Sequence, residues 1–199
     1  MAWTFRNFSR NGGSPPALLD IGCGAGRHAL FFATEGFKAD ACDFSAVGVE
    51  ATRERASKAG LTIGTAVCEA DELVYPDNSF DGALVFGTFT YLPYERFVRA
   101  VEEVQRVLKP GGKALIVTRT YKDSRVDHAE KIGHCTYRIL KMGDGSPSDV
   151  EEGMIMTFLN EAEVEKVFSP FKLVLRDRLT VTMSGGQYFD DDWYIHVEK

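Results

Sequence analysis

Apolar and polar positions form alternating blocks along the first 119 residues, and these blocks predict strands and helices in turn. Strands are expected at 17–21, 38–43, 63–68, 80–86 and 113–117, and helices at 27–35, 45–59 and 93–108. Three of the strands are almost wholly apolar, which is typical of parallel strands that helices cover on both faces. In the last of these helices Phe97, Val101 and Val104 follow helical spacing, with charged residues between them.

Capping and turn residues mark several element boundaries. Ser45 is placed to cap the helix that follows it, and Gly60 to end that helix. The Pro-Gly-Gly sequence at 110–112 prevents the third helix from continuing. Asn160 and Glu163 form a capping-box-like start for a further helix.

The period changes near the C-terminus. Between 173 and 183 most odd positions are apolar and most even positions are polar, and Trp193, Ile195 and Val197 repeat the alternation. This pattern predicts two half-buried strands, which the Ser-Gly-Gly turn at 184–186 joins as an antiparallel pair at one sheet edge. The expected fold class is α/β, in a single domain over 1–199.

Composition narrows the class of protein. The chain has 199 residues, 44% hydrophobic and 26% charged, as in a globular protein with a substantial core. The net charge of −6 and the pI near 5.3 disfavour a nucleic-acid partner. No apolar run has the length of a membrane span, and no signal-peptide core is visible, so a cytoplasmic protein without membrane contact is expected.

The four cysteines, Cys23, Cys42, Cys68 and Cys135, form no C-x-x-C pair. We expect them to be reduced and structural, with no bound metal. The sequence does not indicate an oligomeric state.

The first strand leads into a glycine-rich turn, Asp20-Ile-Gly22-Cys23-Gly24-Ala-Gly26. Glycines at this density allow a sharp backbone turn and let a ligand approach the main chain closely. A dinucleotide fingerprint requires G-x-G-x-x-G, and Arg27 occupies the position of its third glycine. The pattern is therefore G-x-G-x-G.

This pattern resembles motif I of the class I S-adenosylmethionine-dependent methyltransferases of the small-molecule type. Leu73, Phe80 and Asp81 match the family stretch G-D-A-x-x-L-P-F-x-x-x-x-F-D, and residues 108–112 match its L-K-P-G-G. The resemblance is close over about 17–119. It implies a Rossmann-like seven-stranded sheet of order 3-2-1-4-5-7-6, with strand seven antiparallel and helices on both faces.

The resemblance implies a site for S-adenosylmethionine, and for its product S-adenosylhomocysteine, at the carboxyl ends of the first strands. Asp43 ends the second strand, where a carboxylate can accept hydrogen bonds from both ribose hydroxyls, and Phe44 is expected beside the ribose and adenine. Asp20 suits a network that reaches the methionine amino group. The residues expected around the glycine loop and strand ends are Asp20, Gly22, Cys23, Gly24, Gly26 and Phe86.

An acid after the third strand is expected to bind the adenine. Glu69 falls on the family acid that receives the exocyclic amine, and Ala70 supplies the following backbone N–H. Glutamate replaces the family's aspartate here, so the assignment can also shift to Asp71.

The chemistry implied is in-line transfer of the sulfonium methyl group to an O, N or S nucleophile of a small-molecule acceptor. Positioning supplies about 7–11 kcal/mol of barrier reduction, so such enzymes need no fixed catalytic triad. Tyr91 stands where many relatives carry a histidine, and we expect it to line the pocket or donate a hydrogen bond. His134 and His128 are the histidines expected near the mouth, either of which can act as a base.

The segment 120–158 is too long for a simple connection, and no element is predicted firmly within it. We expect it to be an insertion that caps the acceptor, with Trp3 and Phe5 as a candidate lid over the cofactor. Its basic residues hint at an anionic acceptor, such as a carboxylate or a phosphorylated metabolite, although solvated charges are the simpler explanation. The basic residues considered are Lys122, Arg125, His128, Lys131, His134, Arg138 and Lys141, against Asp123, Asp127 and Glu130.

Two other functions remain open. An NAD-linked oxidoreductase would also carry an acid such as Asp43, but the missing third glycine and the C-terminal hairpin argue against it. A non-catalytic subunit that keeps the fold to bind a partner would show a damaged cofactor loop, and this loop is intact.

Overall fold

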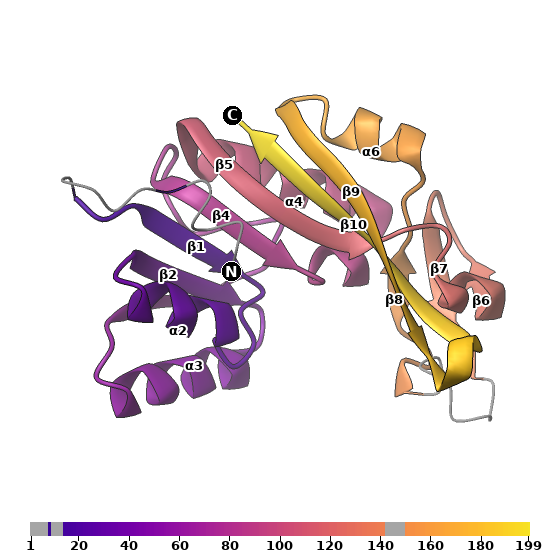
Figure 1. Ribbon diagram of the computed structural model, residues 1–199, viewed down its shortest axis with the longest axis horizontal. Helices are drawn as coiled ribbons and strands as arrows, with labels where there is room; N and C mark the ends of the chain where they lie inside the picture. The colour runs from indigo at the N-terminus through magenta and orange to yellow at the C-terminus, as the bar shows by residue number, and fades with distance from the viewer. Residues whose placement is uncertain (1–7, 9–13, 142–149) are drawn as a thin grey trace.

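The computed structural model describes residue 8 and residues 14–141 and 150–199, and its main feature is a seven-stranded sheet. In spatial order its strands are β3 (Ile63–Val67), β2 (Lys38–Asp43), β1 (Ala17–Ile21), β4 (Phe80–Phe86), β5 (Leu108–Arg119), β10 (Tyr188–Glu198) and β9 (Lys172–Met183) (Figure 1). The first five are parallel, and β10 is antiparallel to both of its neighbours. Numbered within this sheet, the order is the predicted 3-2-1-4-5-7-6.

Helices cover both faces of the sheet, as the apolar strands predicted. They are α2 (Arg27–Thr34), α3 (Ala46–Lys58), α4 (Tyr94–Val107) and α6 (Glu161–Val167). Successive residues of β1 point to opposite faces: Leu18 packs in a cluster with Phe32 of α2, whereas Leu19 packs in another with Phe97 of α4. A strand of this kind must be apolar at nearly every position.

The predicted caps are present, and one boundary differs. Ser45 Oγ accepts a hydrogen bond from Gly48 N at 3.2 Å, and Asn160 Oδ1 accepts one from Glu163 N at 2.9 Å. The third predicted helix ends one residue early, because Leu108 is extended and pairs with β4. Strand β5 is therefore much longer than the expected 113–117.

The insertion at 120–158 contains a small sheet that sequence patterns did not reveal. After the 3-10 helix η2 (Ser124–His128), it forms β6 (Ala129–Lys131), β7 (Thr136–Ile139) and β8 (Ile155–Thr157), in that spatial order. Its interior is a separate apolar cluster of Tyr137, Ile139, Met156 and Phe158. Strands of three or four residues are too short to show a readable period.

The C-terminal hairpin closes the sheet edge as predicted, but its two strands differ in burial. On β10, Ile195 and Val197 are almost completely buried. On β9 neither face is buried. The apolar side chains of Leu175, Leu179 and Val181, which were expected to face the core, are 45–49% exposed, so the prediction that one face of this strand is buried is wrong. The short helix α6 packs over β10, because Val164 shares a cluster with Ile195, and this leaves the edge strand open.

Within the described part of the chain, no helix has both the length and the apolar character that a bilayer span requires.

Candidate functional site

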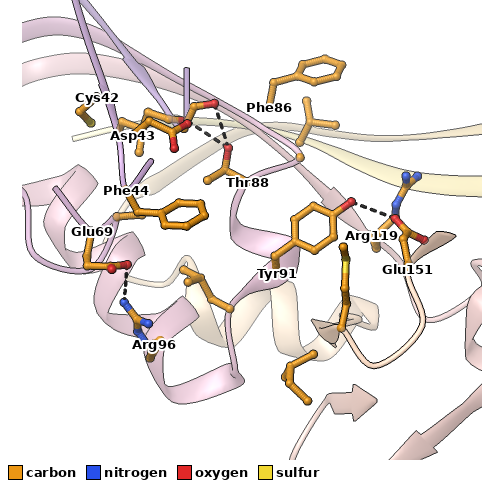
Figure 2. Close-up of a pocket in the computed structure, with 18 of the residues that line it drawn as sticks. Cys42, Asp43, Phe44, Glu69, Phe86, Thr88, Tyr91, Arg96, Arg119 and Glu151 are labelled. Carbon is orange, nitrogen blue, oxygen red and sulfur yellow. Dashed lines mark hydrogen bonds and ion pairs between the residues drawn. The ribbon is translucent and has the colours of Figure 1, made fainter. Parts of the chain in front are cut away.

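A cavity of about 970 Å³ opens at the carboxyl ends of β1, β2, β4 and β5 (Figure 2). Side chains of β10 and of the insertion close its other end. Ligand pockets commonly measure about 300–1,000 Å³, so this cavity is at the upper end of that range. We call the part next to the glycine loop the outer end, and the part next to the insertion the inner end.

The glycine loop is shaped by two threonines. Gly22 has a φ of +74°, and a Cβ there would lie 2.0 Å from Thr88 Oγ1, which hydrogen-bonds Ile21 O at 3.2 Å. At Gly26 a Cβ would lie 2.7 Å from the side chain of Thr52. These glycines therefore make room for side chains that hold the loop. Of the loop glycines, only Gly22 reaches the cavity wall among the described residues.

Asp43 joins the glycine loop to the start of α3 at the outer end. Its Oδ2 accepts a hydrogen bond from Gly24 N at 2.8 Å, and its Oδ1 accepts one from Ser45 N at 2.9 Å. The residue is 9% exposed and lies on the cavity wall. Because each carboxylate oxygen has two lone pairs, Asp43 retains acceptor capacity toward the cavity.

Phe44 and Glu69 lie on the wall near Asp43, as predicted. The Phe44 ring is 71% exposed and points into the cavity (Figure 2). Glu69 Oε2 pairs with Arg96 Nη2 at 2.9 Å, and Ala70 lies beside it on the wall.

Asp71, the alternative to Glu69, points elsewhere. It pairs with Arg96 and with Arg99, whose Nη2 lies 2.8 Å from Asp71 Oδ2, and it is outside the cavity wall. The hydrogen bond from Arg96 outweighs burial and lowers the pKa of Asp71 to about 2. The structure therefore brings Glu69 and Ala70, but not Asp71, to the cavity.

Two cysteines also line the outer end. The hydrogen bond between Cys42 and Cys68 lowers the pKa of Cys68 against the opposing effect of burial. The same contact, together with burial, raises the pKa of Cys42. Both thiols are free in the structure.

Of the other predicted cofactor residues, Phe86 lies on the cavity wall, whereas Asp20 and Cys23 lie outside it. Asp20 is buried, and its Oδ2 accepts a hydrogen bond from Ala29 N at 3.1 Å. Cys23 is buried against Thr52, at 3.7 Å from Sγ to Oγ1. Phe86 is on the wall, 42% exposed, with its ring centroid 5.2 Å from that of His28.

At the inner end, Tyr91 contacts the insertion. Its hydroxyl donates to Glu151 Oε1 at 2.9 Å (Figure 2). Burial and the adjacent Glu151 carboxylate raise the pKa of Tyr91 to about 12, so the phenol stays protonated at neutral pH. Tyr91 can therefore donate a hydrogen bond but is a poor general base in this arrangement.

Arg119 and Asp192 complete the inner end. They are register partners on β5 and β10, and Arg119 Nη1 lies 3.0 Å from Asp192 Oδ2. Burial raises the pKa of Asp192 to about 6, although Arg119 opposes the shift.

His134 and His128 do not reach the cavity wall in the described part of the chain. His134 Nε2 pairs with Glu163 Oε1 at 3.0 Å, and its ring packs edge-on against Tyr94 with 4.5 Å between centroids. One ligand atom each from His134, Cys135 and Glu163 lies within 4.8 Å of the others. Glu163 already accepts the Tyr94 hydroxyl at 2.5 Å, so this group fastens the insertion to α6.

Two further expectations have different outcomes. Trp3 and Phe5 lie outside the described residues. None of the basic residues considered in the insertion lies on the described cavity wall, and Arg125 is buried in ion pairs. Counted over all of 120–158, the insertion has five Lys and Arg against seven Asp and Glu, so it is not basic.

Several wall residues escaped sequence reasoning. Thr88 lies two residues after β4 and Arg119 is the last residue of β5, and these positions at the ends of parallel strands were a usable signal. Glu151 and Asp192 had no such signal, because the insertion and the antiparallel register bring them to the cavity.

This chain is similar to known proteins in sequence and in fold. Residues 18–112 match the methyltransferase domain family. A sterol 4-C-methyltransferase of Caenorhabditis elegans is 31% identical over 125 residues, covering 60% of this chain and 37% of that protein. The chain thus spans well under half the length of this curated relative.

Solved structures share the fold over nearly the whole chain. A SAM-dependent methyltransferase from Methanosarcina mazei superposes with a TM-score of 0.79 at 22% identity, covering 98% of this chain and 96% of the other. The 1,6-didemethyltoxoflavin-N1-methyltransferase of Burkholderia thailandensis, solved with its substrate and S-adenosylhomocysteine, superposes at 0.67 with 19% identity. That match covers 94% of this chain and 72% of the other.

Proposed function

We propose that this chain is a class I S-adenosylmethionine-dependent methyltransferase, which transfers the methyl group of S-adenosylmethionine to a small-molecule acceptor. The observation that carries the proposal is the grouping of Asp43, Phe44 and Glu69 around one end of a cavity beside an intact glycine loop. The order of these residues along the chain also matches the family motifs.

The outer end fits the cofactor. Asp43 has free acceptor capacity for the two ribose hydroxyls, and the exposed Phe44 ring offers a surface for the adenosine. Glu69, on the same wall, would accept the adenine amine while Ala70 offers its backbone N–H. Arg96 holds the Glu69 carboxylate in place.

The inner end would hold the acceptor. The cofactor supplies an activated methyl group for in-line displacement, so the protein has to align the acceptor and exclude water. Tyr91 and Glu151 connect the main sheet to the insertion, which would act as the cap of this single domain. Tyr91 would position the acceptor by packing or by a hydrogen bond, since its pKa of about 12 disfavours a base role.

Titration calorimetry with S-adenosylmethionine, S-adenosylhomocysteine and NAD tests the cofactor assignment. We expect both sulfur nucleosides to bind. At a hundred times Kd each should stabilise the folded chain by about 2.7 kcal/mol, which raises its melting temperature. NAD should have no effect. Binding of NAD alone would show an oxidoreductase instead.

A screen of metabolites for release of S-adenosylhomocysteine tests the transfer. An acceptor that supports turnover establishes a methyltransferase. Failure of S-adenosylmethionine and S-adenosylhomocysteine to bind would contradict the proposal at its first step and favour a non-catalytic protein of the same fold.

A further inference from the structure

The inner end of the cavity is bordered by a network of partly buried ion pairs. Arg119 Nη1 contacts Asp192, and its Nη2 lies 3.2 Å from Asp190 Oδ2. Arg125 Nη1 lies 2.7 Å from Asp190 Oδ1 and 3.1 Å from Asp123 Oδ1, and its Nε contacts Glu151. The network therefore joins β5, β10 and the insertion.

Carboxylates outnumber cations in this network. Two guanidinium groups, of Arg119 and Arg125, face four carboxylates, of Asp123, Glu151, Asp190 and Asp192. The adjoining pair of Arg178 and Asp191, 3.4 Å apart between Nε and Oδ1, adds one charge of each sign. The network thus carries an excess of two negative charges at neutral pH.

The cations in the network are already occupied. Arg119 has three carboxylates within 3.6 Å, and its side chain is only 15% exposed. An anionic acceptor would have to lose its hydration next to four carboxylates and would find no unpaired arginine among these residues. A buried charge without a partner is costly, so the site disfavours an anion.

The carboxylates are better placed to receive a ligand. Asp192 lies on the cavity wall, and both of its oxygens contact the same Arg119 nitrogen, at 3.1 and 3.0 Å. Each oxygen therefore keeps acceptor capacity. Glu151, also on the wall, accepts the Tyr91 hydroxyl on the one oxygen and Arg125 on the other.

We propose that the inner end recognises an acceptor through a cationic group, such as a protonated amine, held by the Asp192 carboxylate with Glu151 nearby. The amine serves as the anchor, and the nucleophile that is methylated is a different atom of the acceptor. The proposal replaces the anionic acceptor that the insertion's basic residues indicated. It rests on the proposed function, since it assumes that the outer end holds the cofactor.

The test uses the full chain saturated with S-adenosylhomocysteine, whose binding is measured first and separately. Probes are phenyl, indolyl and quinolinyl compounds, each compared as the aminomethyl derivative and as the carboxylate, by calorimetry or ligand-observed NMR. A charge-assisted hydrogen bond predicts that the amine binds at least about 10-fold more tightly than its partner. Absence of an amine advantage, including the case in which neither compound binds, overturns the inference.

Two variants locate the contact. Asp192→Asn keeps the size of the side chain and removes its charge, and should reduce amine binding about 10-fold or more while S-adenosylhomocysteine binding is unchanged. Asp177→Asn removes an exposed carboxylate on β9 and should change neither. Equal effects of the two variants on amine binding would overturn the assignment to Asp192.

The pH dependence gives an independent readout. The charged groups that face Asp192 are Arg119 of β5, Asp190 of β10, Asp123 just before η2 and Arg125 within η2. Amine binding should weaken as the pH falls through about 6, because Asp192 becomes protonated while the amine stays charged. Asp192→Asn should abolish that dependence. A dependence that persists in the variant would assign the titration to another group.

Discussion

Replacing Asp43 with alanine gives the most direct test of the cofactor site. Alanine is preferred to asparagine because Asp43 accepts backbone N–H groups on both oxygens, from Gly24 and Ser45. In either orientation an asparagine amide would turn its NH₂ group toward one of these donors. Asp43→Ala removes the carboxylate without adding such a repulsive contact.

The expected loss of affinity follows from the hydrogen bonds proposed for the ribose. Hydrogen bonds to a charged group contribute about 1.5–3 kcal/mol each. Two of them amount to at least about 3 kcal/mol, so S-adenosylhomocysteine should bind on the order of 10²-fold or more weakly to Asp43→Ala.

The variant also loosens the glycine loop, and this effect needs its own control. Thr52 Oγ1 donates to Gly24 O at 2.9 Å, and Thr52 is fully buried and outside the cavity wall. Thr52→Val keeps the shape of that side chain and removes the bond to the loop. Asp40→Asn, on the same strand as Asp43 but away from the wall, controls for the loss of a carboxylate from β2.

Calorimetry with S-adenosylhomocysteine, alongside urea unfolding, separates the two effects. Asp43→Ala should lose affinity far beyond its loss of stability, whereas Thr52→Val should lose about 1–2 kcal/mol of stability and little affinity. Affinity of Asp43→Ala within about 3-fold of the unmodified chain would refute the ribose contact. Equal losses of affinity in both variants would assign the effect to the loop.

Three further predictions address the same region. Phe44→Ala should weaken S-adenosylhomocysteine binding about 2- to 10-fold by calorimetry while leaving the melting temperature nearly unchanged, because this ring is 71% exposed and its stacking contributes about 0.5–1.5 kcal/mol. Cys68 should be alkylated by iodoacetamide at a lower pH than an ordinary thiol, because its contact with Cys42 lowers its pKa, and S-adenosylhomocysteine should protect it in mass spectra of labelled peptides. Labelling that is the same with and without the ligand would place this thiol outside the cofactor site. Asp71→Asn should lower the free energy of unfolding by about 2 kcal/mol at pH 7. The difference should disappear as the pH falls from about 4 toward 2, because a carboxylate with a lowered pKa stabilises the fold only while it is ionised. A difference in urea unfolding that stays constant with pH would contradict this.

The outer end of the cavity was largely predictable because its residues lie within a few positions of parallel strand ends. In such a sheet, residues that follow β1 and β2 must meet at one edge, whatever the details of packing. This argument placed Asp43 and Phe44 at that edge, whereas Glu69 was placed there by its match to the family stretch, and all three line the cavity. The role of Gly22 was not, since the need for glycine comes from the side chain of Thr88, which is distant in sequence.

The insertion was less predictable for a different reason. Its strands are short, and its charged residues do not reveal in sequence whether they face water or each other. Arg125 was grouped with solvated or ligand-binding cations, but its guanidinium is buried among Asp123, Glu151 and Asp190. Only tertiary packing decides between these environments. Here it places Arg125 among carboxylates, so that negative charge is in excess at the inner end of the cavity.

The register of β10 decides which acids face the cavity. Asp190, Asp191 and Asp192 are consecutive, so in a strand the outer two share one face and Asp191 takes the other. The antiparallel pairing sets Asp192 opposite Arg119, while Asp191 contacts Thr120. A shift of one residue would turn Asp192 away from the cavity and exchange the faces of all three. The charge at the inner end therefore depends on the register of the β9–β10 hairpin, which begins at the 184–186 turn. This turn is distant in sequence from the glycine loop at 20–26. Any change to that turn should alter recognition of the acceptor before it alters binding of the cofactor.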